Sequence, residues 1–300
     1  MKPARIASFP SLPQDGFPFW IFNPTNTASV HYRVATIAQY LLCKKNISIK
    51  RTQQTTDDYV YASLFSREDK YLSKISLLSF LKHAAHRPKI VLGLDQSTSK
   101  EEAINHFSNW NIPIDFYTPP EVESWHKARG NDSMAWFCME HVFGFKLALN
   151  LMLASENNVF YADSDVLWFS DFSTHLNRYT RHPIYPSIDA SVESLDFDLV
   201  RLLDQRLGLK LGTPPYGCAG VMLVNRLDLR LLNQFEQSVQ IIRTNLPINR
   251  LTEQTLIAVI AAQSNSCLGE DTIAMNGEIT TFVASFKKNS FTGRHYAGPW

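Results

Sequence analysis

Two aspartates separated by a single residue, Asp163 and Asp165, follow a run of apolar residues in the segment NVFYADSDVLWFS, 158–170. This short run of β-branched and aromatic residues predicts a buried strand, with the carboxylates where the strand ends. On an extended backbone, residues i and i+2 point the same way, about 6–7 Å apart. Two carboxylates at the carboxyl end of a strand indicate a site for a divalent cation and an anionic ligand. Because apolar residues lie on both sides, we also expect a positively charged partner.

Alternating strand and helix patterns precede this motif and must position it. We predict strands over 59–65, 89–94 and 112–117, helices over 69–86, 99–110 and 132–154, and a mobile polar loop over 118–131. Such alternation predicts a parallel sheet with helices on both faces, whose ligands bind at the carboxyl ends of the strands. Besides the two aspartates, this edge would carry Ser66, Arg67, Asp95 and Tyr117.

The pattern is less regular after residue 170. We predict short extended pieces over 178–197, a buried strand over 216–225, helices over 199–209, 228–242 and 253–263, and strand-like pieces over 279–286 and in the final GRHYAGPW. Residues 1–57 are predicted to be an N-terminal extension with one helix, over 27–45. Residues 58–300 would form the main domain.

Composition limits the classes of function. The chain has 300 residues with 29 Lys and Arg against 28 Asp and Glu, so a nucleic-acid partner is not indicated. The four cysteines, Cys43, Cys138, Cys218 and Cys267, include no C-x-x-C pair and are expected to be free thiols in a reducing compartment. No signal peptide and no apolar run of the roughly 18–20 residues of a membrane span is present, which predicts a soluble cytoplasmic protein. The aromatic segment 16–22 is interpreted as a tether over the core, with peripheral membrane or acceptor contact as the alternative.

Four motifs occur in a characteristic order. They are DSD at 163–165, YGCAGVMLVN at 216–225, EQTLI at 253–257, and HYAG at 295–298 followed by PW. This order resembles the family 8 glycosyltransferases, the group of glycogenin and bacterial lipopolysaccharide galactosyltransferases, over about residues 58–300. The segment YADSDVLWF also resembles the corresponding motif of family 77. The resemblance implies a GT-A fold, a Rossmann-like α/β fold with a mostly parallel sheet flanked by helices. It further implies a nucleotide-diphosphate sugar donor, with a UDP-sugar first, and transfer with retention of anomeric configuration.

Three positions depart from the family pattern. Cys218 stands where the family has asparagine, and Glu253 stands where it has aspartate. The spacer and lysine that precede the family's P-W are absent before Trp300. The first two departures concern the identity of the donor sugar, and the third concerns contact with the diphosphate.

Loss of a nucleoside diphosphate requires a hard divalent cation and basic side chains to neutralise the leaving group. Two carboxylates favour Mg²⁺ or Mn²⁺, and an imidazole ligand favours Mn²⁺, because Mg²⁺ prefers oxygen throughout. We therefore expect Asp165 to bind the metal directly, Asp163 to bind the metal or the ribose, and His295 to complete the protein ligands.

The remaining site residues are expected to contact the donor. Lys146, in FGFKLAL, matches a basic residue of the family and would face the diphosphate or donor sugar; its alternative is a solvated helix lysine. Glu253 and Gln254 would contact sugar hydroxyls near the anomeric carbon, or only complement a helix dipole. These three are the candidate catalytic residues, and no nucleophile is identified. Asp95 would receive the base, or be a turn residue. The donor site would also include Ser66, Arg67, Ser164, Gly217, Cys218, Ala219, Gly220 and Gly298.

Two other functions stay open. A GT-A domain that binds a sugar nucleotide without turnover would account for Cys218 and the missing spacer. A phosphatase of the haloacid dehalogenase kind also begins with an apolar strand ending in D-x-D, but there the motif lies near the start of the fold and a lysine and an acidic pair follow. Here three strand–helix units precede Asp163, and only Glu270 and Asp271 resemble the pair. The acceptor, whether glycan, lipid-linked glycan or protein, has no diagnostic motif.

Overall fold

A computed structural model describes residues 55–110, 112–189, 192–227, 229–269, 271–274 and 292–295. The helix predicted over 27–45, the strand-like piece over 279–286 and Gly298 lie outside the described residues.

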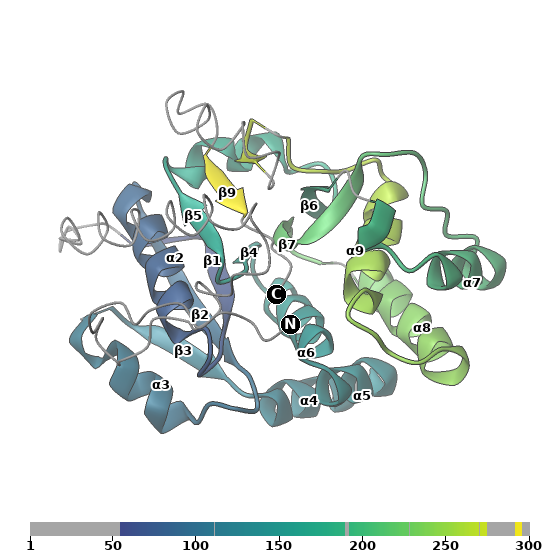
Figure 1. Ribbon diagram of the computed structural model, residues 1–300, viewed down its shortest axis with the longest axis horizontal. Helices are drawn as coiled ribbons and strands as arrows, with labels where there is room; N and C mark the ends of the chain where they lie inside the picture. The colour runs from purple at the N-terminus through teal and green to yellow at the C-terminus, as the bar shows by residue number, and fades with distance from the viewer. Residues whose placement is uncertain are drawn as a thin grey trace, which may run out of the picture.

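A six-stranded sheet forms the centre of the fold, in the order β3-β2-β1-β4-β7-β6 (Figure 1). Its strands are β1 (Thr55–Phe65), β2 (Arg87–Leu94), β3 (Ile114–Tyr117), β4 (Val159–Ala162), β6 (Ile184–Asp189) and β7 (Tyr216–Val224). The first four in this order are parallel, as the strand–helix alternation predicts. β7 is antiparallel to both β4 and β6. The sheet is therefore mixed, with its parallel half in the first part of the chain.

Helices cover both faces of this sheet. They are α2 (Lys70–His83), α3 (Lys100–Phe107), α4 (Pro119–Lys127), α5 (Asp132–Glu140), α6 (Val142–Ala154), α7 (Phe197–Leu207), α8 (Leu229–Asn245) and α9 (Thr252–Ala262), with short 3-10 turns at Ser108–Trp110, Phe172–Arg178 and Val192–Ser194. Side chains of β1 alternate between the faces. Val60 and Ala62 join the core under α5, α6, α8 and α9, whereas Tyr59 and Tyr61 join an aromatic-rich core under α2 and α3.

The polar segment 118–131 is mostly helix, so the prediction of a mobile loop there is wrong. α4 begins after Thr118, whose N–H and hydroxyl both donate to the Glu121 carboxylate at 2.8 Å. Pro119 and Pro120 occupy the first turn, where a helix has no use for their missing N–H groups. Capping and preset proline angles thus produce a helix in a stretch of polar composition.

The single long helix predicted over 132–154 is two helices, α5 and α6. His141 between them is extended, with φ −151° and ψ 142°, and its Nδ1 accepts a hydrogen bond from the Phe143 N–H at 3.1 Å. At Gly144 a Cβ would clash with the Phe137 carbonyl. The break therefore lets the two helices pack closely. The N-terminal half of α6, which carries Lys146, lies at the carboxyl end of β4, and the end of α6 leads to the start of that strand.

A second, three-stranded sheet follows the aspartate motif. It contains β5 (Val166–Trp168), β8 (Ile273–Ala274) and β9 (Gly293–His295), in the order β5-β9-β8. β9 runs antiparallel to β5 and places His295 opposite Val166. The second sheet thereby brings the far end of the chain beside the aspartate pair.

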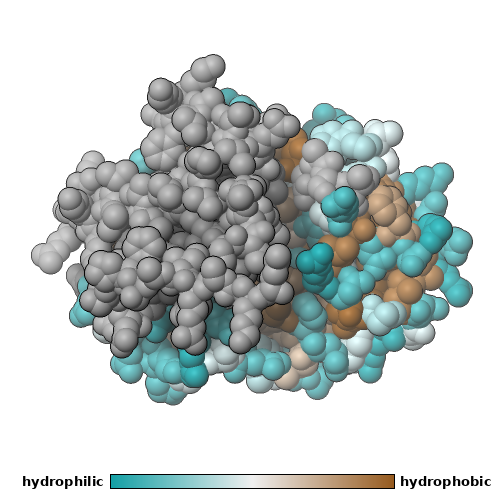
Figure 2. Space-filling view, viewed as in Figure 1, coloured by the Kyte–Doolittle hydropathy of each residue, from teal (hydrophilic) through white to brown (hydrophobic). Residues whose placement is uncertain are grey.

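The described surface on the face shown in Figure 2 mixes polar residues with a group of apolar ones on the side of α7, α8 and α9. None of the helices within the described ranges is both long and apolar enough to span a bilayer.

Candidate active site

The two aspartates lie in a tight turn between β4 and β5. The Val166 N–H donates to the Asp163 carbonyl at 3.3 Å, and the Asp163 N–H donates to the Gly220 carbonyl of β7 at 2.8 Å. The backbone at Ser164 and Asp165 is therefore a turn and not the extended strand that the sequence predicts. A turn still directs both carboxylates to one place, because it is fixed at one end to β7 and at the other to β5.

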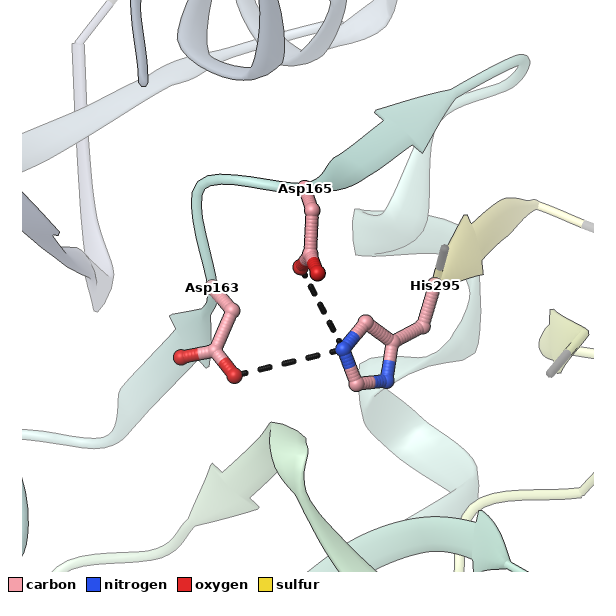
Figure 3. A group of neighbouring side chains, drawn as sticks. All are labelled: Asp163, Asp165 and His295. Atoms are coloured by element: carbon pink, nitrogen blue, oxygen red, sulfur yellow. Dashed lines mark ion pairs between the residues drawn. The ribbon is translucent and has the colours of Figure 1, made fainter. Parts of the chain in front are cut away.

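His295 completes a group with these carboxylates (Figure 3). Its Nε2 lies 3.3 Å from Asp165 Oδ1 and 3.9 Å from Asp163 Oδ2, and the imidazole is buried. One ligand atom from each of the three residues lies within 4.8 Å of the other two. The structure thus brings together the three residues that the sequence predicts as metal ligands.

The electrostatics of this group suit a cation. Burial lowers the pKa of His295, but the carboxylate of Asp165 more than compensates and holds that pKa well above its usual range. Asp165 Oδ1 is buried and, among the described residues, receives no hydrogen bond of good geometry. Carboxylate oxygen and imidazole nitrogen are ligands of Mn²⁺, and a buried carboxylate oxygen that faces only the His295 imidazole among the described side chains fits a metal ion.

Lys146 lies in the second turn of α6 and contacts Asp163. Its Nζ is 3.4 Å from Asp163 Oδ1 and 3.4 Å from Glu253 Oε2, and the residue is only 2% exposed. Burial lowers the pKa of Lys146, but Asp163 and Glu253 raise it above its usual value. Lys146 is therefore the positive partner expected beside the aspartates, and the alternative of a solvated helix lysine is wrong.

Tyr161 is a site residue that sequence reasoning missed. Its hydroxyl donates to Asp163 Oδ1 at 2.6 Å, and its side chain is fully buried. Burial and the neighbouring carboxylate of Asp163 raise the pKa of Tyr161 well above its usual value. The signal was present in the sequence, because Tyr161 precedes Asp163 by two residues and a strand places such residues on one side.

Glu253 is buried in the first turn of α9, with 2% exposure. Burial raises its pKa to about 8, although the nearby Lys146 opposes this. Its Oε1 has no hydrogen-bond partner among the described residues. A buried carboxyl paired with a lysine does more than complement a helix dipole, and near neutral pH much of it carries a proton.

Gln254 binds the start of β7 through both ends of its amide. Nε2 donates to the Gly217 carbonyl and Oε1 accepts from the Ala219 N–H, each at 2.7 Å. The residue between them, Cys218, has its sulfur 3.8 Å from Nδ1 of His295. At Gly220 a Cβ would clash with the imidazole of His295. Gly220 therefore provides the space that the ring occupies.

The residues predicted after β1 and β2 lie at the same edge of the sheet but have local partners. Ser66 and Asp69 bond to each other, and Arg67 pairs with Glu102 at 2.8 Å in an exposed contact. Asp95 Oδ1 accepts from the N–H and hydroxyl of Ser97. Asp95 is thus a turn residue, and these contacts leave its expected role toward a base untested.

Comparison with solved structures identifies the fold. Mouse xyloside xylosyltransferase 1 superposes with a TM-score of 0.55 at 12% sequence identity, over 80% of this chain and 97% of that one. The WbbM bifunctional glycosyltransferase superposes with a TM-score of 0.55 at 13% identity, over 91% of this chain and 54% of that one. No protein-family model matches the sequence, and no curated protein matches it by sequence comparison. The chain has the GT-A fold of glycosyltransferases, and the resemblance drawn from the motifs is confirmed at the level of fold.

Proposed function

We propose that the protein is a metal-dependent glycosyltransferase that moves a sugar from a nucleotide-diphosphate sugar to an acceptor. The observation that carries the proposal is the convergence of Asp163, Asp165 and His295, within a GT-A fold, at the carboxyl end of β4. Ligands of open α/β sheets bind at this edge. The transferase domain is assigned to residues 58–300, and by the family resemblance the donor is a UDP-sugar and transfer retains the anomeric configuration.

The three ligands would hold Mn²⁺, or Mg²⁺ as the alternative. When bound, such an ion supplies the positive charge that stabilises a leaving diphosphate. The two carboxylate oxygens of Asp163 have different partners. Oδ2 faces His295, and Oδ1 accepts hydrogen bonds from Tyr161 and Lys146. Tyr161 and Lys146 thus fix the orientation of the Asp163 carboxylate.

Lys146 and Glu253 are assigned to the donor end of the site. The ammonium of Lys146 adds positive potential where negative charge develops on the leaving group. Glu253, in its protonated form, has a hydrogen to donate to a sugar oxygen. Gln254 would contact the sugar only by giving up its two bonds to β7, so its support for the proposal is indirect. The nucleotide would extend along Ser164, Gly217, Ala219 and Gly220 toward Ser66, Arg67 and Asp95.

A direct test is to incubate the full chain with a panel of UDP-sugars and Mn²⁺ and to measure release of UDP. We expect release that depends on Mn²⁺, stops in excess EDTA, and is lost in D165N. The control is C267A, because Cys267 is a half-buried thiol with no place in the site. Full activity of D165N, or activity insensitive to EDTA, would refute the metal assignment.

Two results would favour the alternatives. Calorimetric binding of UDP-sugar without transfer or hydrolysis, with every acceptor class tried, would indicate a binding domain without turnover. A phosphoenzyme formed from a phosphate ester would indicate the phosphatase, which the GT-A fold disfavours. A glycan, lipid-linked glycan or protein acceptor, a cytoplasmic location and peripheral membrane contact follow from the sequence-based interpretation alone.

A further inference from the structure

The two nitrogens of the His295 ring face different partners. Nε2 faces the carboxylates of Asp165 and Asp163, at 3.3 and 3.9 Å. Nδ1 lies 3.8 Å from the sulfur of Cys218. In Figure 3 both dashed lines reach the same ring nitrogen, and the other nitrogen points away from the aspartates. The partner of that second nitrogen decides how the ring is oriented and which tautomer it holds.

The geometry points to Cys218 as a positioning residue of the metal site: its sulfur accepts a hydrogen bond from Nδ1–H of His295 and keeps Nε2 directed at the aspartates. This inference rests on the proposed function, because it takes Asp163, Asp165 and His295 as a cation site. It gives Cys218 a task different from the sugar contact expected of the family's asparagine at this position.

The sulfur is itself held in place. The Gly220 N–H donates to it at 3.5 Å, and Cys218 is only 6% exposed. The amide of Gln254 binds the peptide groups on both sides of Cys218, at Gly217 and Ala219. A sulfur fixed at the backbone and from a second N–H has little freedom to move, as orienting a ring requires.

Cys218 acts through His295 and not as a ligand. The atoms that gather for a cation belong to Asp163, Asp165 and His295, and the sulfur lies on the Nδ1 side of the imidazole. Outer partners that orient a metal-bound imidazole, usually carboxylates or carbonyls, are worth roughly tenfold to a hundredfold in metal affinity. Sulfur is a weaker acceptor, so the lower end of this range is the expectation for Cys218.

The first measurement is the Mn²⁺ affinity of the full chain, from the electron paramagnetic resonance signal of free Mn²⁺. We expect C218A to weaken binding by roughly tenfold or more. C218S, which keeps an acceptor on the same Cβ, should lie between C218A and the native protein. C267A should bind as the native protein does. Native affinity in C218A, or C218S as weak as C218A, would overturn the inference.

D165N separates this inference from the proposed function. Native Mn²⁺ affinity in D165N would refute the metal site itself. Weak binding in D165N together with native affinity in C218A would refute only the role of Cys218. Folding of each variant is checked by its thermal unfolding transition.

Two spectra test the same point, the first of them on the native protein alone. In the Zn²⁺-loaded protein, NMR of the histidine nitrogens should find the proton of His295 on Nδ1; a proton on Nε2 would overturn the inference. In the Co²⁺-loaded protein we expect no thiolate-to-cobalt charge-transfer band. Such a band, absent in C218A, would make Cys218 a ligand and would also overturn it.

Discussion

Polar residues gather at two places along the carboxyl edge of the main sheet, and they are satisfied in different ways. At the exposed edge after β1 and β2, Asp95 bonds to its own turn and Arg67 pairs with Glu102 on the surface. After β4, a charged cluster is largely buried and is assembled from four distant segments. Its members are Lys146, Tyr161, Asp163, Asp165, Glu253 and His295.

The difference indicates where function lies. Turn bonds and exposed ion pairs cost little to form and are common on any surface. Buried charges cost several kcal/mol each unless they are matched, and apolar residues of similar volume are often at least as stable. In this cluster Glu253 Oε1 has no hydrogen-bond partner among the described residues, and Asp165 Oδ1 has only the ion pair with His295. Stability alone does not account for such an arrangement, whereas the proposed binding of a cation and a donor sugar would.

The largest effect should come from removing the central cation of the cluster. K146M removes the ammonium that pairs with the half-buried Asp163 carboxylate and with the buried Glu253 carboxyl group, so we expect the free energy of unfolding to fall by about 3–5 kcal/mol. Urea denaturation measures this loss. R67M, which breaks the exposed pair with Glu102, should leave the urea midpoint close to that of the native protein.

A second variant distinguishes uncompensated charge from lost packing. K146M/E253L removes the buried carboxyl group of Glu253 together with the lysine, and we expect it to regain part of the stability that K146M loses. Equal urea midpoints for K146M, R67M and the native protein would mean that the ion pairs of the cluster contribute no more to stability than the exposed pair does.

The second-largest effect tests which of the two places binds the metal. H295A removes an imidazole ligand, and we expect Mn²⁺ binding to weaken by at least roughly a hundredfold, since loss of outer partners alone costs up to that much. D95N, at a turn of the exposed edge, should keep native Mn²⁺ affinity and at most raise the KM for the nucleotide sugar. Equal Mn²⁺ affinities for the two variants, measured by titration calorimetry, would contradict the placement of the cation.

A pH dependence follows from the buried carboxyl. The pKa of Glu253 is about 8 in the folded state, so the folded protein keeps a proton that the unfolded chain releases above its ordinary pKa near 4.5. The free energy of unfolding should therefore fall as pH rises from about 5 to 8, by roughly 1–3 kcal/mol relative to E253Q. The raised pKa of Lys146 has its effect only above its ordinary 10.5, outside this window.

E121Q is the matched control for this dependence. Burial tends to raise the pKa of Glu121, but Lys100 and Thr118 hold it below its usual value. Its contribution is complete above the ordinary pKa and is lost only in more acidic solution. The difference between native and E121Q should stay flat between about pH 5 and pH 8. A flat difference for E253Q as well would show that Glu253 ionises freely.

Part of the fold and of the site could be predicted from the sequence. Periodicity predicted the four parallel strands of the main sheet, though not their order, and the motif order predicted the three metal candidates. Burial of Lys146 was also readable, because α6 is apolar all round in FGFKLALNLML and leaves a lysine no exposed face. The contacts of Gln254 and Cys218 with β7 and His295 were not, since they depend on how α9, β7 and β9 pack. The polar composition of α4 likewise hides its helical character, which depends on the capping contacts between Thr118 and Glu121.

The smallest effect tests whether the cluster needs close packing that the surface does not. G220A adds a Cβ that would clash with the His295 imidazole, so we expect the ring to shift and Mn²⁺ affinity to fall by roughly tenfold while the protein stays folded. G130A is the opposite case: Gly130 has φ +74° and no atom within 4 Å of an added Cβ. It should cost about 1–2 kcal/mol of stability through its left-handed backbone and leave Mn²⁺ affinity unchanged. Native Mn²⁺ affinity in G220A would contradict this expectation. It would mean that a movement of β9 lets His295 reach the aspartates without the space beside Gly220.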